Sequence, residues 1–115
     1  MDYSKLSDAE INWKVAFHIG LRTVEKAESG DFNPCNNPAD AWPIISANRI
    51  SVEYDSEDQC DVPAEWVTAY GIDGLKVHVV AHQPCNKALR SAMIVFLMMQ
   101  DSANVPANST GSDLR

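Results

Sequence analysis

The chain has 115 residues with a net charge of −7 at neutral pH, and 45% of its residues are hydrophobic. This length and apolar fraction predict one domain with one core. The negative charge disfavours binding to DNA, RNA or anionic membranes, because each of these needs a basic protein face. We expect residues 1–101 to form a single globular α+β domain and residues 102–115 a disordered tail, which is poor in apolar side chains.

The N-terminal segment, the apolar runs and the cysteines favour a cytoplasmic protein. Residues 1–10 lack the basic and then apolar pattern of a signal peptide. The longest apolar run, Ala92–Met99, is far shorter than the roughly 20 residues that span a bilayer. The three cysteines form no CxxC pair, which favours free thiols in a reducing compartment over a disulfide framework.

The first predicted helix is marked at both ends. Ser7 and Glu10 have the spacing of a capping box, and Leu6 and Ile11 have the spacing of a hydrophobic staple. Gly20 is suited to end the helix, because glycine adopts the left-handed conformation without a steric cost.

The sequence FNPCNNPADAWPII, residues 32–45, predicts a rigid turn that leads into a short helix. Asn37 suits the N-cap, and Pro38 suits the first helical position, where no backbone amide is needed. Pro43 removes one intrahelical hydrogen bond, so we expect the helix to kink or restart next to it. Asn48 is the predicted C-cap of this helix.

Four segments have the composition or alternation of strands. They are a weak edge strand at residues 22–28, and stronger strands at residues 50–54, 65–70 and 75–82. A loop is predicted at Ser29 and Gly30, a hairpin connection at Gly71–Gly74, and the end of the last strand at Pro84.

The last predicted helix, residues 86–99, is apolar nearly all round from Ala92 onward, so we expect it to be the most buried element. The order of the elements predicts the α+β class. The expected architecture is a small antiparallel sheet of three to four strands packed against two or three helices, with a flexible C-terminal tail.

Chemical motifs are weak throughout. His78 and His82 fall on a predicted strand, where residues four apart are about 13 Å from each other, too far to share a zinc ion. Cys35 precedes a helix start that can lower a thiol pKa, and His82 is a conceivable base for it. Cys60 lies between Asp58 and Asp61, whose negative charges raise its thiol pKa and lower its reactivity. The acidic residues within 53–61 lack the EF-hand spacing that would predict a calcium site. We predict no catalytic residues, no metal and no cofactor.

Trp42 has two interpretations. We favour a buried Trp42 that packs against the sheet, with Cys35 as a passive neighbour, because aromatic residues beside apolar runs are usually core. The alternative leaves Trp42 partly exposed beside Cys35, where both line a pocket. The candidate ligand-binding or partner-binding residues are Cys35, Asn36, Asn37, Trp42, Trp66 and Tyr70.

Three blocks, MDYSKLSDAEIN, FNPCNNPADAWPII and ALRSAMIVFLMMQ, occur in this order along the chain. Their order and spacing resemble the NinX family of small proteins from temperate bacteriophages and prophages of enteric bacteria. The resemblance covers the chain up to about residue 100. Because the function of that family is unknown, the resemblance implies no site residues. It implies an accessory protein in the cytoplasm of the bacterial host.

Three functions stand as hypotheses. The favoured one is a small acidic accessory protein, not an enzyme, that binds a host or phage protein, for instance one of a host defence system. The second is a small-molecule binder for a nucleotide signal. Its available side chains are the aromatic rings of Trp42, Trp66, Tyr54 and Tyr70 and the cations of Arg49, Lys76 and Arg90. The third is a cysteine-dependent enzyme that uses Cys35.

Overall fold

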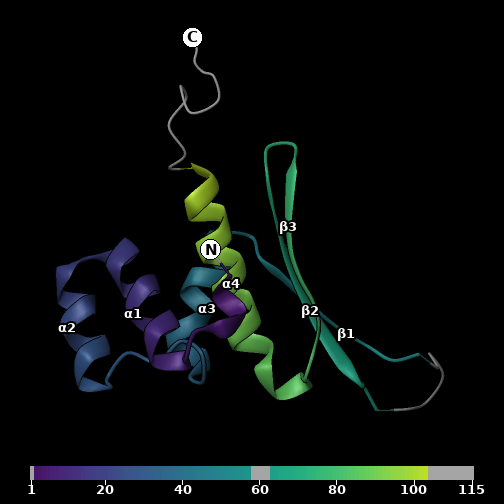
Figure 1. Ribbon diagram of the computed structural model, residues 1–115, viewed down its shortest axis with the longest axis horizontal. Helices are drawn as coiled ribbons and strands as arrows, with labels where there is room; N and C mark the ends of the chain where they lie inside the picture. The colour runs from purple at the N-terminus through teal and green to yellow at the C-terminus, as the bar shows by residue number, and fades with distance from the viewer. Residues whose placement is uncertain (1, 58–62, 104–115) are drawn as a thin grey trace, which may run out of the picture.

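The structure, a computed structural model, describes residues 2–57 and 63–103 (Figure 1). The elements in chain order are the 3-10 turn η1 (Tyr3–Lys5), helices α1 (Asp8–Ile19), α2 (Leu21–Ser29) and α3 (Pro38–Ala47), strands β1 (Ser51–Asp55), β2 (Trp66–Asp73) and β3 (Lys76–Gln83), the 3-10 turn η2 (Cys85–Lys87) and helix α4 (Ala88–Ala103). The predicted α+β class is confirmed.

Helix α4 lies between the sheet and the other helices (Figure 1). The three strands form an antiparallel sheet in the order β1-β2-β3, so β1 and β3 are its two edges. On one side α4 packs against β2 and β3, and on the other it contacts α1 and α3. Helix α2 packs on α1, at a distance from the sheet (Figure 1).

The core is centred on α4, as the sequence predicted. Every residue from Ser91 to Leu97 is buried, and the side chains of Met93 and Val95 have no exposed surface. The helix continues to Ala103, past the predicted domain end at residue 101. Most of the predicted tail, residues 104–115, lies outside the described residues.

The predicted start of α1 is confirmed. The Ser7 amide donates to Glu10 Oε1 at 2.9 Å, and the Glu10 amide donates to Ser7 Oγ at 3.1 Å, which completes the capping box. Ile11 and Val15 are fully buried. The helix ends at Gly20, whose φ of 153° is positive but outside the left-handed helical region that we expected.

The predicted edge strand at residues 22–28 is wrong, because this segment belongs to helix α2. Val24 and Ala27 are three residues apart, so they share one helical face, and both pack against the core. Thr23 and Val24 are β-branched and favour a strand locally. The helical spacing of Val24 and Ala27 nevertheless determines the structure of this segment. Gly30 has φ of 88° and ends the helix, which places the loop where we predicted it.

The predicted hairpin connection at Gly71–Gly74 is also wrong in its position. Strand β2 continues to Asp73, and the turn consists of Gly74 and Leu75. Gly74 has φ of 62° and Leu75 has no positive φ, the pattern of a type II′ turn. Gly71 serves packing instead, since a Cβ atom there would lie 2.6 Å from the sulfur of Met99.

An irregularity in the β2–β3 pairing lies between Val67 and Ala69. Opposite it, His82 has φ of 53°, a conformation that a non-glycine residue rarely adopts. The ring of His82 stacks on that of Trp66, with 4.7 Å between the ring centroids. Strand β3 ends directly before Pro84, as predicted.

Helix α3 runs without interruption through Pro43, so the predicted restart does not occur. The Ala39 carbonyl is the group that loses a partner, and because Ala39 is exposed, water can satisfy it. Both predicted caps are confirmed. Asn37 Oδ1 accepts from the Ala39 amide at 3.0 Å, and Asn48 donates from its side chain to the Ile44 carbonyl at 2.8 Å.

Candidate partner-binding groove

Trp42 is 65% exposed, so the prediction that it lies in the core is wrong. The helical period of α3 explains its position. Ala41, Ile44 and Ile45 are spaced by three and four residues and form the buried face of the helix. Trp42 follows Ala41 directly and is therefore turned away from that face.

Trp42 stands at a groove between α3, β1 and the start of α4. We call this feature the Trp42 groove. Its volume is about 580 Å³, within the range of about 300–1,000 Å³ typical of ligand sites. The lining side chains that matter most here are Trp42, Ile45, Glu53, Tyr54, Tyr70 and Leu89. Tyr54 is 57% exposed, so two large aromatic rings meet solvent in one region.

The groove is apolar with an acidic margin. Glu53 is the only charged residue among the described residues that line it, and its Oε2 accepts from the Tyr70 hydroxyl at 2.8 Å. Asp55, Glu57 and Glu65 are exposed where β1 ends and β2 approaches. The other acidic residues of the predicted loop, Asp58 and Asp61, lie outside the described residues, as does Cys60.

Cys35, Asn36 and Asn37 have structural contacts and do not line the groove. Cys35 is 2% exposed, and its backbone amide donates to Asn12 Oδ1 at 3.0 Å. Asn36 Nδ2 donates to Asp8 Oδ2 at 3.0 Å. Asn37 caps α3. The segment therefore joins the start of α3 to α1.

Two further contacts of α1 lie next to this connection, one to the segment before α3 and one to α4. Asn12, which is buried, donates from Nδ2 to Asn33 Oδ1 at 2.8 Å. Asp8 forms an ion pair of 2.7 Å with Arg90 of α4. We call the group formed by Asp8, Asn12, Asn33, Cys35, Asn36 and Arg90 the α1–α3 clamp.

The electrostatics of the α1–α3 clamp oppose a nucleophilic role for Cys35. Burial raises the pKa of its thiol to about 12, and the nearby Asp8 carboxylate adds to the increase. Burial also acts to raise the pKa of Asp8, but hydrogen bonds from Asn36 and Arg90 outweigh it and hold that pKa below its usual value. The sequence suggested a lowered thiol pKa, which the structure contradicts. His82 stacks on Trp66 instead of contacting Cys35.

The structure thus brings together two of the six predicted site residues, Trp42 and Tyr70. Trp66 lies at the start of β2, four residues before Tyr70, and does not line the Trp42 groove. Sequence reasoning missed Glu53 and Leu89. Leu89 falls within the predicted last helix, residues 86–99, but it is only half-buried near the start of α4. No local pattern in the sequence placed Leu89 beside the groove, because that position depends on how α4 packs beside α3 and β1.

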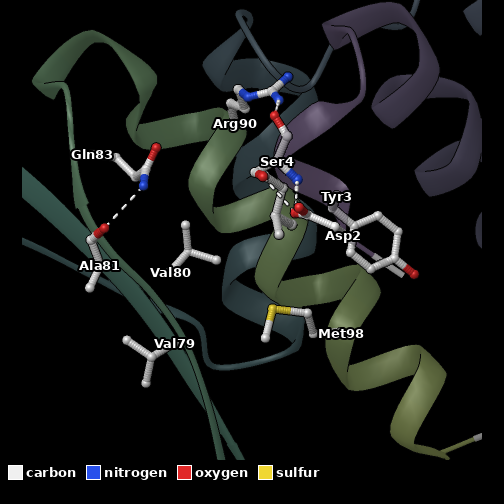
Figure 2. Close-up of a pocket in the computed structure, with 10 residues that line it drawn as sticks. Asp2, Tyr3, Ser4, Val79, Val80, Ala81, Gln83, Arg90 and Met98 are labelled. Carbon is white, nitrogen blue, oxygen red and sulfur yellow. Dashed lines mark hydrogen bonds between the residues drawn. The ribbon is translucent and has the colours of Figure 1, made fainter.

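A second cleft, of about 290 Å³, lies between η1, β3 and α4 (Figure 2). Its polar groups are already paired. The Arg90 guanidinium donates to the Ser4 carbonyl at 3.2 Å, the Ser4 amide donates to Asp2 Oδ1 at 3.0 Å, and Gln83 Nε2 donates to the Ala81 carbonyl at 3.0 Å (Figure 2). Among the described residues that line this cleft, no uncommitted cation is left for an anionic ligand.

The cations suggested for a nucleotide phosphate are not assembled in either place. Arg90 is held by Asp8 and by the Leu6 carbonyl at 2.7 Å. Lys76 Nζ lies 3.4 Å from Ser102 Oγ, beside the end of α4. Arg49 is exposed and is not among the residues that line the Trp42 groove.

Metal-ligating side chains do not cluster in threes within residues 2–57 and 63–103. Over the same residues, no helix combines the length and the apolar character needed to cross a membrane.

These features define a small α+β protein with an apolar surface groove and a buried cysteine whose thiol pKa is raised. The chain belongs to the bacteriophage P22 NinX family, whose pattern matches residues 2–100. The resemblance seen in the three sequence blocks is thereby confirmed. Neither the curated proteins nor the solved structures gave a match.

Proposed function

We propose that this protein is a non-enzymatic phage accessory protein that binds a host or phage protein through the Trp42 groove. The observation that carries the proposal is the exposure of Trp42 and Tyr54 at one apolar groove. Tryptophan and tyrosine dominate the binding energy of protein interfaces, because each buries a large area and loses little rotamer freedom. An exposed aromatic pair that stabilises nothing in the core is well suited to this role.

The charge of the molecule supports a protein partner over a nucleotide. Cations are the usual partners of a bound phosphate, and the described lining of the groove contains neither lysine nor arginine. An acidic surface instead attracts a basic protein surface and speeds its association. The net charge of −7 favours such a partner. A host defence protein remains one class of target within this proposal.

The hypothesis of a cysteine enzyme has lost its support. A thiol nucleophile acts as the thiolate, and a pKa of about 12 leaves almost none of it at neutral pH. Cys35→Ala should therefore keep the full biological effect of the protein.

Site-specific photo-crosslinking in phage-infected cells tests the proposal. A benzophenone amino acid replaces Trp42 in one variant and Leu75, a fully exposed residue of the β2–β3 turn, in a matched control. We expect a discrete crosslinked product from position 42 that position 75 does not give. Co-expressed protein that has Trp42 and no crosslinking amino acid should compete for the partner and reduce the product. Co-expressed Trp42→Ala should not reduce it. Equal products from both positions, or no product at position 42, would overturn the proposal.

A further inference from the structure

The wall of the Trp42 groove formed by β1 is the edge of a strand. Ser51, Val52, Glu53 and Tyr54 all line the groove, although they are consecutive in the chain. Neighbouring side chains of a strand point to opposite faces of the sheet. A groove that runs along the strand's edge, where the backbone itself is accessible, accounts for four consecutive lining residues.

No strand in the described part of the chain lies beside this edge. Within the described residues, β1 pairs with β2 on one side, and the sheet order leaves its other side as an outer edge. Exposure increases along the strand, from the half-buried Ser51 and Val52 to the exposed Glu53, Tyr54 and Asp55. Outward amide and carbonyl groups of such an edge are able to pair with another chain. Trp42 of α3 stands on the opposite wall of the groove.

We propose that an extended, basic segment of the partner protein adds to β1 as a fourth strand. This proposal rests on the proposed function and names the chemistry of its partner. Backbone hydrogen bonds to the β1 edge supply affinity, and alternate apolar side chains of the segment insert between Trp42 and Tyr54. The side chains on the other face of the segment reach the acidic margin.

Charge complementarity predicts that the segment is positively charged. Glu53, Asp55, Glu57 and Glu65 surround the strand and its end, and all four are exposed. The only ion pair among the described residues is Arg90–Asp8, so these four carboxylates have no cation bound to them there. Lysine or arginine on the segment would neutralise them. A second copy of this acidic chain would instead be repelled, which makes it a poorer occupant than a basic segment.

The first experiment selects the segment without assuming a partner. A library of random twelve-residue peptides is selected on the full-length protein, and the selected peptides are then tested for binding to Trp42→Ala. We expect the selected peptides to be basic, to alternate apolar and polar residues, and to lack proline at the centre. Their affinity for Trp42→Ala should be at least about tenfold weaker, the usual cost of losing an interface tryptophan. Acidic or unpatterned peptides would overturn the inference.

The second experiment measures amide hydrogen exchange in β1 with the tightest selected peptide bound. Amides of residues 51–55 that exchange fast in the free protein should slow by at least about tenfold, because they become donors in a new ladder. A peptide that depends on Trp42 but leaves these amides unprotected would refute strand addition and leave the groove as a binding site. A peptide that binds Trp42→Ala as well as the parent would refute the groove as the site, and with it the proposed function.

Discussion

The two halves of one short segment, residues 32–45, have opposite environments. Cys35, in the first half, is 2% exposed and lies within the α1–α3 clamp, whereas Trp42, seven residues later, is 65% exposed. The first half is fixed by hydrogen bonds to α1, and this fixes the direction of α3. The second half holds its tryptophan outside the core. The comparison shows that a rigid, polar turn can be the support of a site without being part of it.

The largest effect is expected from a mutation in the core of the domain, which supports both halves of the segment. Met93 of α4 is fully buried, so Met93→Asp leaves either a buried charge or a protonated carboxyl in an apolar site. We expect a loss above about 4 kcal/mol, enough to unfold the domain. Circular dichroism should show no cooperative thermal transition. A parent-like transition would mean that α4 is not the core.

A change in Asn12 tests the α1–α3 clamp alone. Asn12→Ala leaves the buried Cys35 amide without its acceptor and deprives Asn33 of a donor. We expect a loss of about 2–3 kcal/mol in the free energy of unfolding, measured by urea denaturation. Asn36→Ala is the control, because Asn36 is exposed and should cost less than about 1 kcal/mol. Equal losses would show that burial does not set the strength of these contacts.

A change in Trp42 tests the other half. Replacing a well-buried tryptophan by alanine costs about 3–5 kcal/mol of folding free energy. With 65% of the residue exposed, Trp42→Ala should cost less than about 1 kcal/mol in the same urea experiment. A loss of 3 kcal/mol or more would mean that the ring packs in the core in solution, contrary to the open groove.

A change in pH tests the buried Cys35 thiol in the first half of the segment. Its pKa is about 12 in the folded protein, against an ordinary value of 9.0. Above pH 9 the unfolded chain loses this proton and the folded protein keeps it, so stability falls as pH rises from about 9 towards 12. The difference in unfolding free energy between the parent and Cys35→Ala should therefore shift against the parent between pH 8 and pH 10.5. A constant difference would show that the thiol titrates normally when folded.

Most of the fold was predictable because local signals agreed with it. The capping box of α1, the Asn37 and Asn48 caps of α3 and the apolar run of α4 each involve residues close in sequence. The error at α2 had a different origin. Thr23 and Val24 favour a strand locally, and only the packing of Val24 against the core shows that the helical spacing prevails.

The site was less predictable because it depends on contacts between distant segments. The helical period of Ala41, Ile44 and Ile45 already placed Trp42 off the buried face of α3, and this signal was present in the sequence. The proximity of Tyr54 and Leu89 was not. It depends on how β1 and α4 pack beside α3, which no local pattern specifies.

The central position of α4 has a consequence for how the protein is made. The sheet, α1 and α3 all pack on α4, yet α4 is the last of the described elements to leave the ribosome. At a synthesis rate of about 5–20 residues per second, the earlier helices and strands wait with their apolar faces uncovered. The domain can close only after residues 91–97 emerge. A translation product that stops before residue 91 has nothing to fold around, so a late nonsense mutation in this phage gene should act as a complete loss of the protein.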